Sequence, residues 1–126
     1  MRGTLEVQAG PGVVVLLLRG DHDLSTQPCL QAHIDDAHAA GLSVVVDLSE
    51  AGLIDSAILT TILRAQKRAT NGDGGRGHEL AAVASPGARF VARMLSLVHI
   101  EDHVAVHHSL DSAVVSLQRT AARATE

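Results

Sequence analysis

The fold is decided by the stretch VVVDLSEAGLIDSAILTTILRAQKRAT, residues 44–70. It begins with an apolar run from Val44 to Leu48, which is typical of a strand covered on both faces. The segment from Leu59 to Thr70 has helical spacing, with apolar side chains on one side and three basic side chains mostly away from it. Asp55-Ser56-Ala57-Ile58 stands between them. An acid and a hydroxyl therefore occupy the point where a strand passes into a helix.

Two strands are predicted before this stretch. Leu5 to Gln8 alternates like a half-buried edge strand, and Val13 to Leu18 is a continuous apolar run typical of a central strand. The turn residues Gly10-Pro11-Gly12 lie between them and predict a hairpin. Gly20 to Leu24 then forms a polar connection.

The rest of the chain alternates between helix and strand. The first predicted helix is capped by Ser25 or Thr26, has Pro28 in its first turn and ends at Gly41. After residue 70, the predicted elements are the strand Leu80 to Ala84, a helix that begins at Ser85-Pro86, the strand Val104 to Val106 and a helix from Ser109 through Leu117. The Gly-rich segment Asn71 to Gly77 is predicted to be a linker, because it follows a helix and lacks the Gly-Lys-Ser/Thr ending of a phosphate loop.

This order of elements predicts an α/β fold. It implies a mixed, mostly parallel sheet of about five strands with right-handed crossovers through about four helices. No internal repeat or second domain is visible. We therefore expect a single domain over residues 4–117 and a C-terminal tail over residues 118–126, which frays from Thr120.

Composition excludes several function classes. The chain has 126 residues, 46% of them hydrophobic and 19% charged, which is typical of a globular protein. Its net charge is -4 and its aromatic content 1%, so neither a basic surface nor base stacking is expected for nucleic-acid binding.

The N-terminus lacks signal-peptide character, the apolar run Val13 to Leu18 is too short to span a bilayer, and a single Cys29 suits a reducing compartment. We expect a cytoplasmic protein without membrane insertion.

Several motifs, taken in order, resemble the STAS domain of bacterial anti-sigma factor antagonists. The resemblance covers roughly Thr4 to Leu117. Gly20 to Leu24 resembles the family's Gly-acid-apolar-Asp turn, and Val45 to Ser49 resembles its third strand. Asp55 to Leu59 resembles its Asp-Ser-(Ser/Thr)-Gly-Leu signature. The set of Ser85-Pro86, Leu95, Ile100 and Val104 resembles its third helix and last strand.

The resemblance implies a function in protein binding. Such an antagonist binds an anti-sigma factor that is also a Ser/Thr protein kinase, and phosphorylation of the second hydroxyl residue in the signature ends that binding. A phosphate adds about -1.5 to -2 charge, which here would lie beside acidic groups on a docking surface. The partner contacts that the resemblance implies are Asp23, Asp55, Ser56, Ala57 and Ile58.

Three positions depart from the family pattern. Ala57 matches the residue that would carry the phosphate, Ile58 matches the glycine, and His22 matches the apolar residue between the two acids of the first turn. The resemblance therefore implies a docking protein without the usual phosphorylation switch. Ser56 is an alternative phosphorylation site, and His titration or Cys29 chemistry are alternative controls.

Ordinary structural roles compete with these functional ones. Asp55 or Ser56 can cap the following helix, and Asp23 can form an Asx turn. Cys29 can be a small packed residue instead of a reactive thiol. Four histidines, namely His99, His103, His107 and His108, lie close in sequence, but their spacing matches no zinc motif and we expect no metal or cofactor.

Two further function classes remain open. The chain can be an interaction module of another system, such as a scaffold, a transporter-associated subunit or a homodimer. It can also be a nucleotide or small-molecule sensor, because ligands often bind where parallel strands end. Catalysis is not expected, since Ser56 has neither a histidine partner in its sequence neighbourhood nor a Gly-x-Ser-x-Gly elbow.

Overall fold

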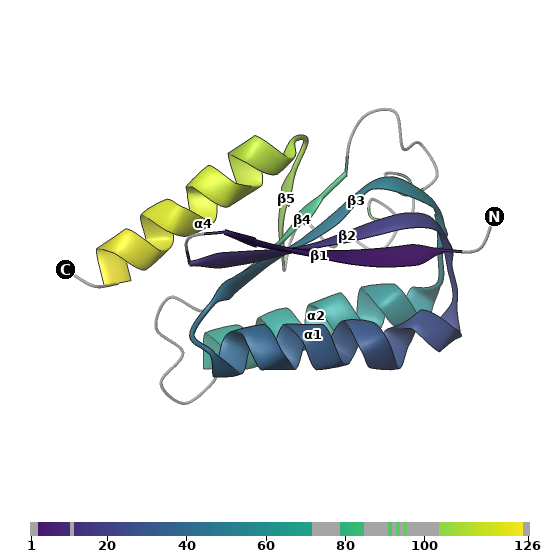
Figure 1. Ribbon diagram of the computed structural model, residues 1–126, viewed down its shortest axis with the longest axis horizontal. Helices are drawn as coiled ribbons and strands as arrows, with labels where there is room; N and C mark the ends of the chain where they lie inside the picture. Colours follow the sequence, from purple (N-terminus) through teal and green to yellow (C-terminus); the bar gives the residue numbers. More distant parts are fainter. Residues whose placement is uncertain are drawn as a thin grey trace.

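A single sheet lies between two helical layers in the computed structural model, which describes residues 3–10, 12–71, 79–84, 91, 93, 95 and 104–124 (Figure 1). The five strands follow their sequence order across the sheet. β1 is antiparallel to β2, and all other neighbours are parallel. The strands are β1 Thr4–Gly10, β2 Val13–His22, β3 Ser43–Ile54, β4 Leu80–Val83 and β5 Ala105–His107. The predicted α/β class, with a mixed and mostly parallel sheet, is confirmed.

The described helices are the 3₁₀ helix η1 Leu24–Thr26 and the α-helices α1 Gln27–Ala39, α2 Ser56–Asn71 and α4 Leu110–Ala124. Figure 1 shows α1 and α2 side by side beneath the sheet and α4 on its opposite face. The described part of the chain thus contains three α-helices, whereas about four are predicted. The helix predicted from Ser85-Pro86 and the linker from Gly72 to Gly77 lie largely outside the described residues.

Helices cover both faces of the sheet. Successive side chains of a strand point to opposite faces, so each strand contributes to two cores. Leu16 and Val46 face α1 and α2, where Ile34 and Ile62 complete the larger core. The neighbouring residues on the strands face α4, whose Leu117 belongs to a smaller second cluster. This double burial explains the continuous apolar runs that the sequence shows in β2 and β3.

Two strands are longer than predicted. β2 continues through the predicted polar connection to His22, and β3 continues to Ile54. Their pairing includes register shifts between Leu17 and Arg19 and again between Gly20 and His22. Gly20 adopts a φ of 76°, a conformation that favours glycine. Backbone pairing therefore extends the ladder where the side-chain pattern no longer indicates a strand.

The ends of two helices differ from expectation. Thr26 precedes α1, but its side chain forms no capping hydrogen bond to that helix, and the Ser25 hydroxyl binds Asp23 instead. Pro in the first turn of α1 is confirmed, and Gly41 ends that helix with a φ of 79°. α4 is helical to Ala124, past Leu117 and into the predicted tail, and residues 110–124 contain neither glycine nor proline. The predicted fraying from Thr120 stays a prediction.

Within the described residues, no helix is long and apolar enough to cross a lipid bilayer.

Candidate docking surface at the ends of strands β2 and β3

Two acidic turns meet at the carboxyl ends of β2 and β3. These strands are parallel neighbours, and His22 pairs with Ile54 at their ends. The Asp55 backbone N–H then donates to the His22 carbonyl oxygen at 3.0 Å. Asp23 and Asp55, which directly follow these strand ends, are thereby held at the same edge of the sheet.

Asp55 caps helix α2. Its Oδ1 accepts a hydrogen bond from the Ala57 backbone N–H at 2.9 Å, and the Ser56 hydroxyl lies 3.4 Å from the same oxygen. The capping role predicted for Asp55 or Ser56 is therefore confirmed, and Asp55 performs it. Both side chains are exposed. The Asp55 carboxylate thus lies at the positive end of the helix dipole and still faces solvent.

Asp23 caps the 3₁₀ helix η1. Its Oδ1 accepts hydrogen bonds from the Ser25 backbone N–H at 2.9 Å and from the Ser25 hydroxyl, which confirms the predicted local turn. The Ser25 hydroxyl first, and the Ser25 backbone N–H second, hold the pKa of Asp23 below its ordinary value of 3.8. Asp23 is therefore a fixed negative charge at neutral pH.

We expect Ser25→Ala to raise the pKa of Asp23 towards 3.8, because the hydroxyl that makes the largest contribution is removed. A carboxyl group whose pKa is lower in the folded state stabilises the fold at pH values above its unfolded-state pKa. This contribution is lost as the pH falls through the folded-state pKa. NMR titration of the Asp23 side-chain carboxyl carbon measures the change. Ser112→Ala, which removes a hydroxyl from α4, should leave the titration unaltered. An unchanged Asp23 pKa in Ser25→Ala would contradict this assignment.

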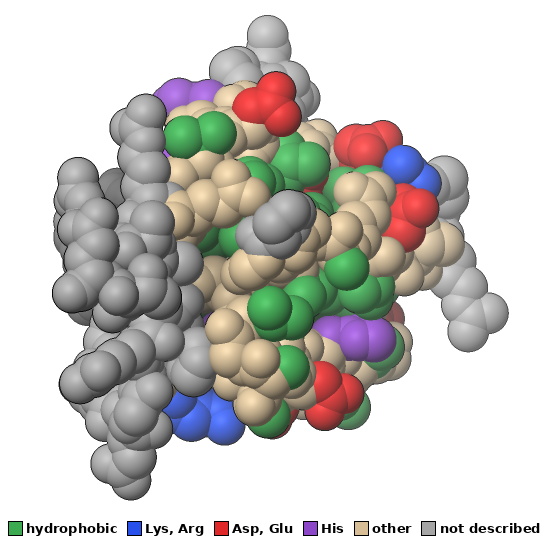
Figure 2. All heavy atoms as spheres, turned by 60° about the vertical axis from the view of Figure 1, so that its left-hand side comes forward, with side chains coloured by type: hydrophobic (Ala, Val, Ile, Leu, Met, Phe, Trp, Pro, Cys, Tyr) green, Lys and Arg blue, Asp and Glu red, His purple; other side chains and the backbone are tan. Residues whose placement is uncertain are grey.

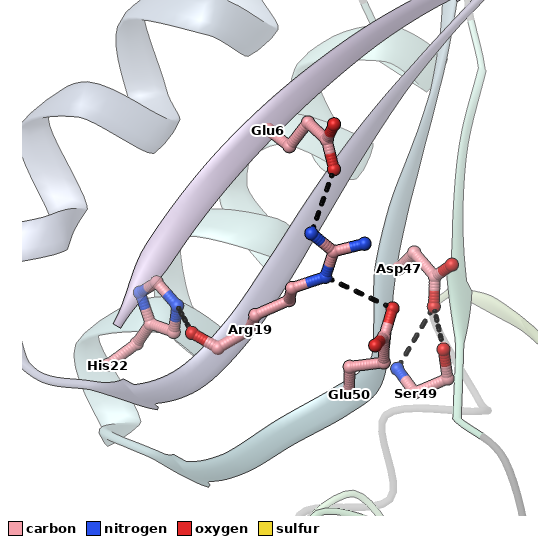
Figure 3. Close-up of polar contacts among 6 residues, drawn as sticks. All are labelled: Glu6, Arg19, His22, Asp47, Ser49 and Glu50. Atoms are coloured by element: carbon pink, nitrogen blue, oxygen red, sulfur yellow. Dashed lines mark hydrogen bonds and ion pairs between the residues drawn. The ribbon is translucent and has the colours of Figure 1, made fainter. Parts of the chain in front are cut away.

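His22 is buried beneath this edge and is only 4% exposed. Its Nε2 lies 3.0 Å from the Arg19 carbonyl oxygen, a contact drawn in Figure 3, and its Nδ1 lies 3.0 Å from the Thr26 hydroxyl oxygen. A carbonyl only accepts, so Nε2 carries the proton and donates it. The histidine thus satisfies both ring nitrogens and connects the end of β2 to η1, at a position where the family pattern has an apolar residue.

Ile58 does not reach the surface. Its side chain is 0% exposed and packs in the larger core beneath the sheet. The implied role of Ile58 as a direct partner contact is therefore corrected to that of a supporting core residue. Ala57 is half-buried beside the exposed Ser56.

Two exposed leucines at this edge were not singled out from the sequence. Leu24 is 66% exposed directly after Asp23, and Leu53 is 47% exposed shortly before Asp55. An apolar residue inside a polar turn is the signal that could have drawn attention to Leu24. We call the exposed or half-buried side chains at these strand ends the strand-end surface; its members are Asp23, Leu24, Leu53, Asp55, Ser56 and Ala57.

A charged group crosses the sheet near this edge (Figure 3). Arg19 on β2 lies 3.3 Å from Glu6 on β1 and 3.3 Å from Glu50 on β3. Asp47 is buried, and it accepts hydrogen bonds from the Ser49 backbone N–H at 2.9 Å and the Ser49 hydroxyl at 2.6 Å. Exposed ion pairs contribute about 0.2–1 kcal/mol each, so the two pairs of Arg19 add little to the stability of the fold.

The family model described as Mlab, STAS domain matches residues 5–110 of this chain. The chain belongs to the STAS domain family. No match was found among curated protein sequences.

Solved structures show the same STAS fold. The crystal structure of an anti-sigma factor antagonist from Mycobacterium paratuberculosis is 23% identical, with a TM-score of 0.76 over 93% of this chain and 95% of that one. The phosphorylated form of the Bacillus cell fate determinant SpoIIAA is 14% identical, with a TM-score of 0.65 over 90% and 99% of the two chains. A sulfate transporter family protein from Wolinella succinogenes is 15% identical, with a TM-score of 0.66 over 90% and 91%.

The other candidate sites of this STAS domain have weaker support. Cys29 is exposed, so the interpretation as a packed residue is wrong, while its reactivity stays a prediction. Among the described residues, no three His, Cys, Asp or Glu side chains are grouped as metal ligands. His107 Nδ1 lies 3.0 Å from the Ser112 hydroxyl and His108 is exposed. His99 and His103 lie outside the described residues.

Proposed function

We propose that this STAS domain protein docks an anti-sigma factor of the Ser/Thr kinase type through the strand-end surface. The observation that carries the proposal is the hydrogen bond from Asp55 N–H to the His22 carbonyl. It holds the turn at Asp23 against the start of α2, the two segments on which the resemblance places partner contacts. The proposed role is binding without catalysis, in the cytoplasm.

The chemistry of the strand-end surface suits a protein partner. Asp23 and Asp55 offer exposed carboxylates, and Leu24 and Leu53 offer exposed apolar side chains. A partner with basic side chains around an apolar hollow would be complementary to this combination, since charges speed encounter and buried apolar anchors provide most of the affinity.

The proposed docking lacks the usual switch. Ala57 occupies the acceptor position and has no hydroxyl to phosphorylate. Ser56 is exposed, and its hydroxyl lies beside the Asp55 carboxylate at 3.4 Å, so it stays a candidate for an alternative phosphorylation site. A phosphate there would add negative charge next to Asp55 and thereby weaken docking.

The test is affinity purification of the tagged full-length protein from its host, with identification of bound proteins by mass spectrometry. The wild type should retain an anti-sigma or kinase-domain protein. Leu24→Asp should lower the retained amount about 5- to 10-fold, as expected when an anchor worth somewhat more than 1 kcal/mol is lost. The fold should be unaffected because Leu24 is 66% exposed.

Val115→Asp is the matched control. Val115 is 45% exposed on α4, on the opposite face of the sheet from α1 and α2, and its replacement adds the same charge. This variant should retain the partner. Absence of any anti-sigma or kinase-like partner, or equal retention by both variants, would refute the proposal.

A second candidate function is an interaction module of a transport system. The structural likeness to the Wolinella succinogenes transporter family protein and the alanine at the acceptor position favour it. The same purification distinguishes the two, because retention of membrane transport proteins instead of an anti-sigma factor supports this alternative.

A further inference from the structure

A basic pocket lies between helices α1 and α2. Its volume is about 460 Å³, and it is lined by Gln31 from α1 and by Arg64, Lys67 and Arg68 from α2. All three ionisable residues on its wall are cations. The volume falls in the range of small-molecule sites, about 300–1,000 Å³.

Such a concentration of positive charge is unexpected in this chain. The sequence has 10 Lys and Arg against 14 Asp and Glu, yet three of the ten basic residues line this one pocket. On the face that Figure 2 shows, Lys and Arg side chains of the described residues surface in only two small places. Arg64 and Arg68 are four residues apart, a spacing at which like charges disfavour a helix. An anion between the helices would offset this repulsion.

The pocket is partly organised by the Asp35 carboxylate. Asp35 Oδ1 accepts a hydrogen bond from Gln31 Nε2 at 2.9 Å and lies 3.6 Å from Arg68 Nη1. Lys67, like Arg68, makes an interaction of its own within the protein. Within the described residues, Arg64 takes part in no ion pair or hydrogen bond. Its guanidinium therefore carries donors that a bound anion can use.

We propose that this pocket binds a phosphate-bearing small molecule with at least two negative charges. Guanidinium groups present paired N–H donors that match phosphate oxygens, and a lysine adds a point charge. Among the described residues, no aromatic side chain lines the pocket, so recognition rests on phosphate and not on stacking of a base. Arg64 lies about 13 Å along α2 from Asp55, so this site is separate from the strand-end surface and does not depend on the proposed docking.

The first experiment is isothermal titration calorimetry of the full chain with pyrophosphate. We expect saturable binding that weakens as salt is raised, because both partners are charged and exposed. Arg64→Gln/Arg68→Gln should bind at least about tenfold more weakly, as two charge-assisted contacts are lost. Arg19→Gln is the control: it removes an exposed arginine that pairs with Glu6 and Glu50 on the sheet, and it should leave binding unchanged.

Two further measurements test where pyrophosphate binds and whether binding requires phosphate. In NMR titrations of the wild type, pyrophosphate should shift amide signals around Gln31 and Arg64 but not those of β1. ADP should compete with pyrophosphate, whereas an Asp-rich peptide of equal charge should not. Absence of saturable binding, binding that the double variant retains, or binding of the peptide alone would overturn the proposal.

Discussion

Ile58→Gly is expected to lower the free energy of unfolding by about 3–6 kcal/mol. The side chain of Ile58 is 0% exposed, and truncation of such a core residue costs about 2–5 kcal/mol. Glycine within a helix costs about 1 kcal/mol more. Because domains are stable by only about 5–15 kcal/mol, this single change would remove a large part of the total.

Urea and thermal unfolding measure this effect. Ile58→Val keeps most of the buried volume and should cost only about 0.5–1.5 kcal/mol. A glycine variant within about 1 kcal/mol of the wild type would show that the side chain does not support the core as described. Substitution of Ile58, at the family's glycine position, therefore tests the stability of the fold. Docking has to be tested by substitution of exposed residues.

Ala57→Glu is expected to weaken partner binding about 30-fold or more without loss of stability. A carboxylate placed against a partner without a matching cation costs about 2 kcal/mol or more. In the isolated protein, an acid in the first turn of α2 lies near the positive helix end, which stabilises by about 0.3–1 kcal/mol. Repulsion from the neighbouring Asp55 offsets part of that gain.

Titration calorimetry with the purified partner, alongside thermal unfolding, separates the two quantities. Ala57→Ser is the informative control, since it keeps a small side chain and supplies a hydroxyl. It should bind like the wild type, and the partner kinase with ATP should phosphorylate it and release it, while position 57 of the wild type stays unmodified. Wild-type affinity in Ala57→Glu would remove Ala57 from the docking surface.

The sequence predicted the fold because its signals lie in long apolar runs. Val13 to Leu18 is continuously apolar, and Val44 to Leu48 is interrupted only by Asp47, because both faces of the sheet are covered. The strand ends were harder. From Arg19 to His22 the ladder is maintained by backbone hydrogen bonds and a glycine with positive φ, which side-chain alternation does not reveal.

The candidate site was predictable only in part. The cap at Asp55 follows from local chemistry, and burial of Ile58 could have been inferred from its helical spacing with Ile62 and Ala65. The family resemblance assigned it to the surface instead. The pocket between α1 and α2 depends on how segments from different parts of the chain pack, which no local pattern encodes.

His22 connects three segments of the chain at this edge of the sheet. Its ring contacts the Arg19 carbonyl through Nε2 and the Thr26 hydroxyl through Nδ1, and its own carbonyl accepts from the Asp55 N–H. One buried residue thereby links the end of β2, helix η1 and the start of α2. A displacement of any one of these segments would strain the contacts that His22 makes with the other two, so the two acidic turns are mechanically coupled.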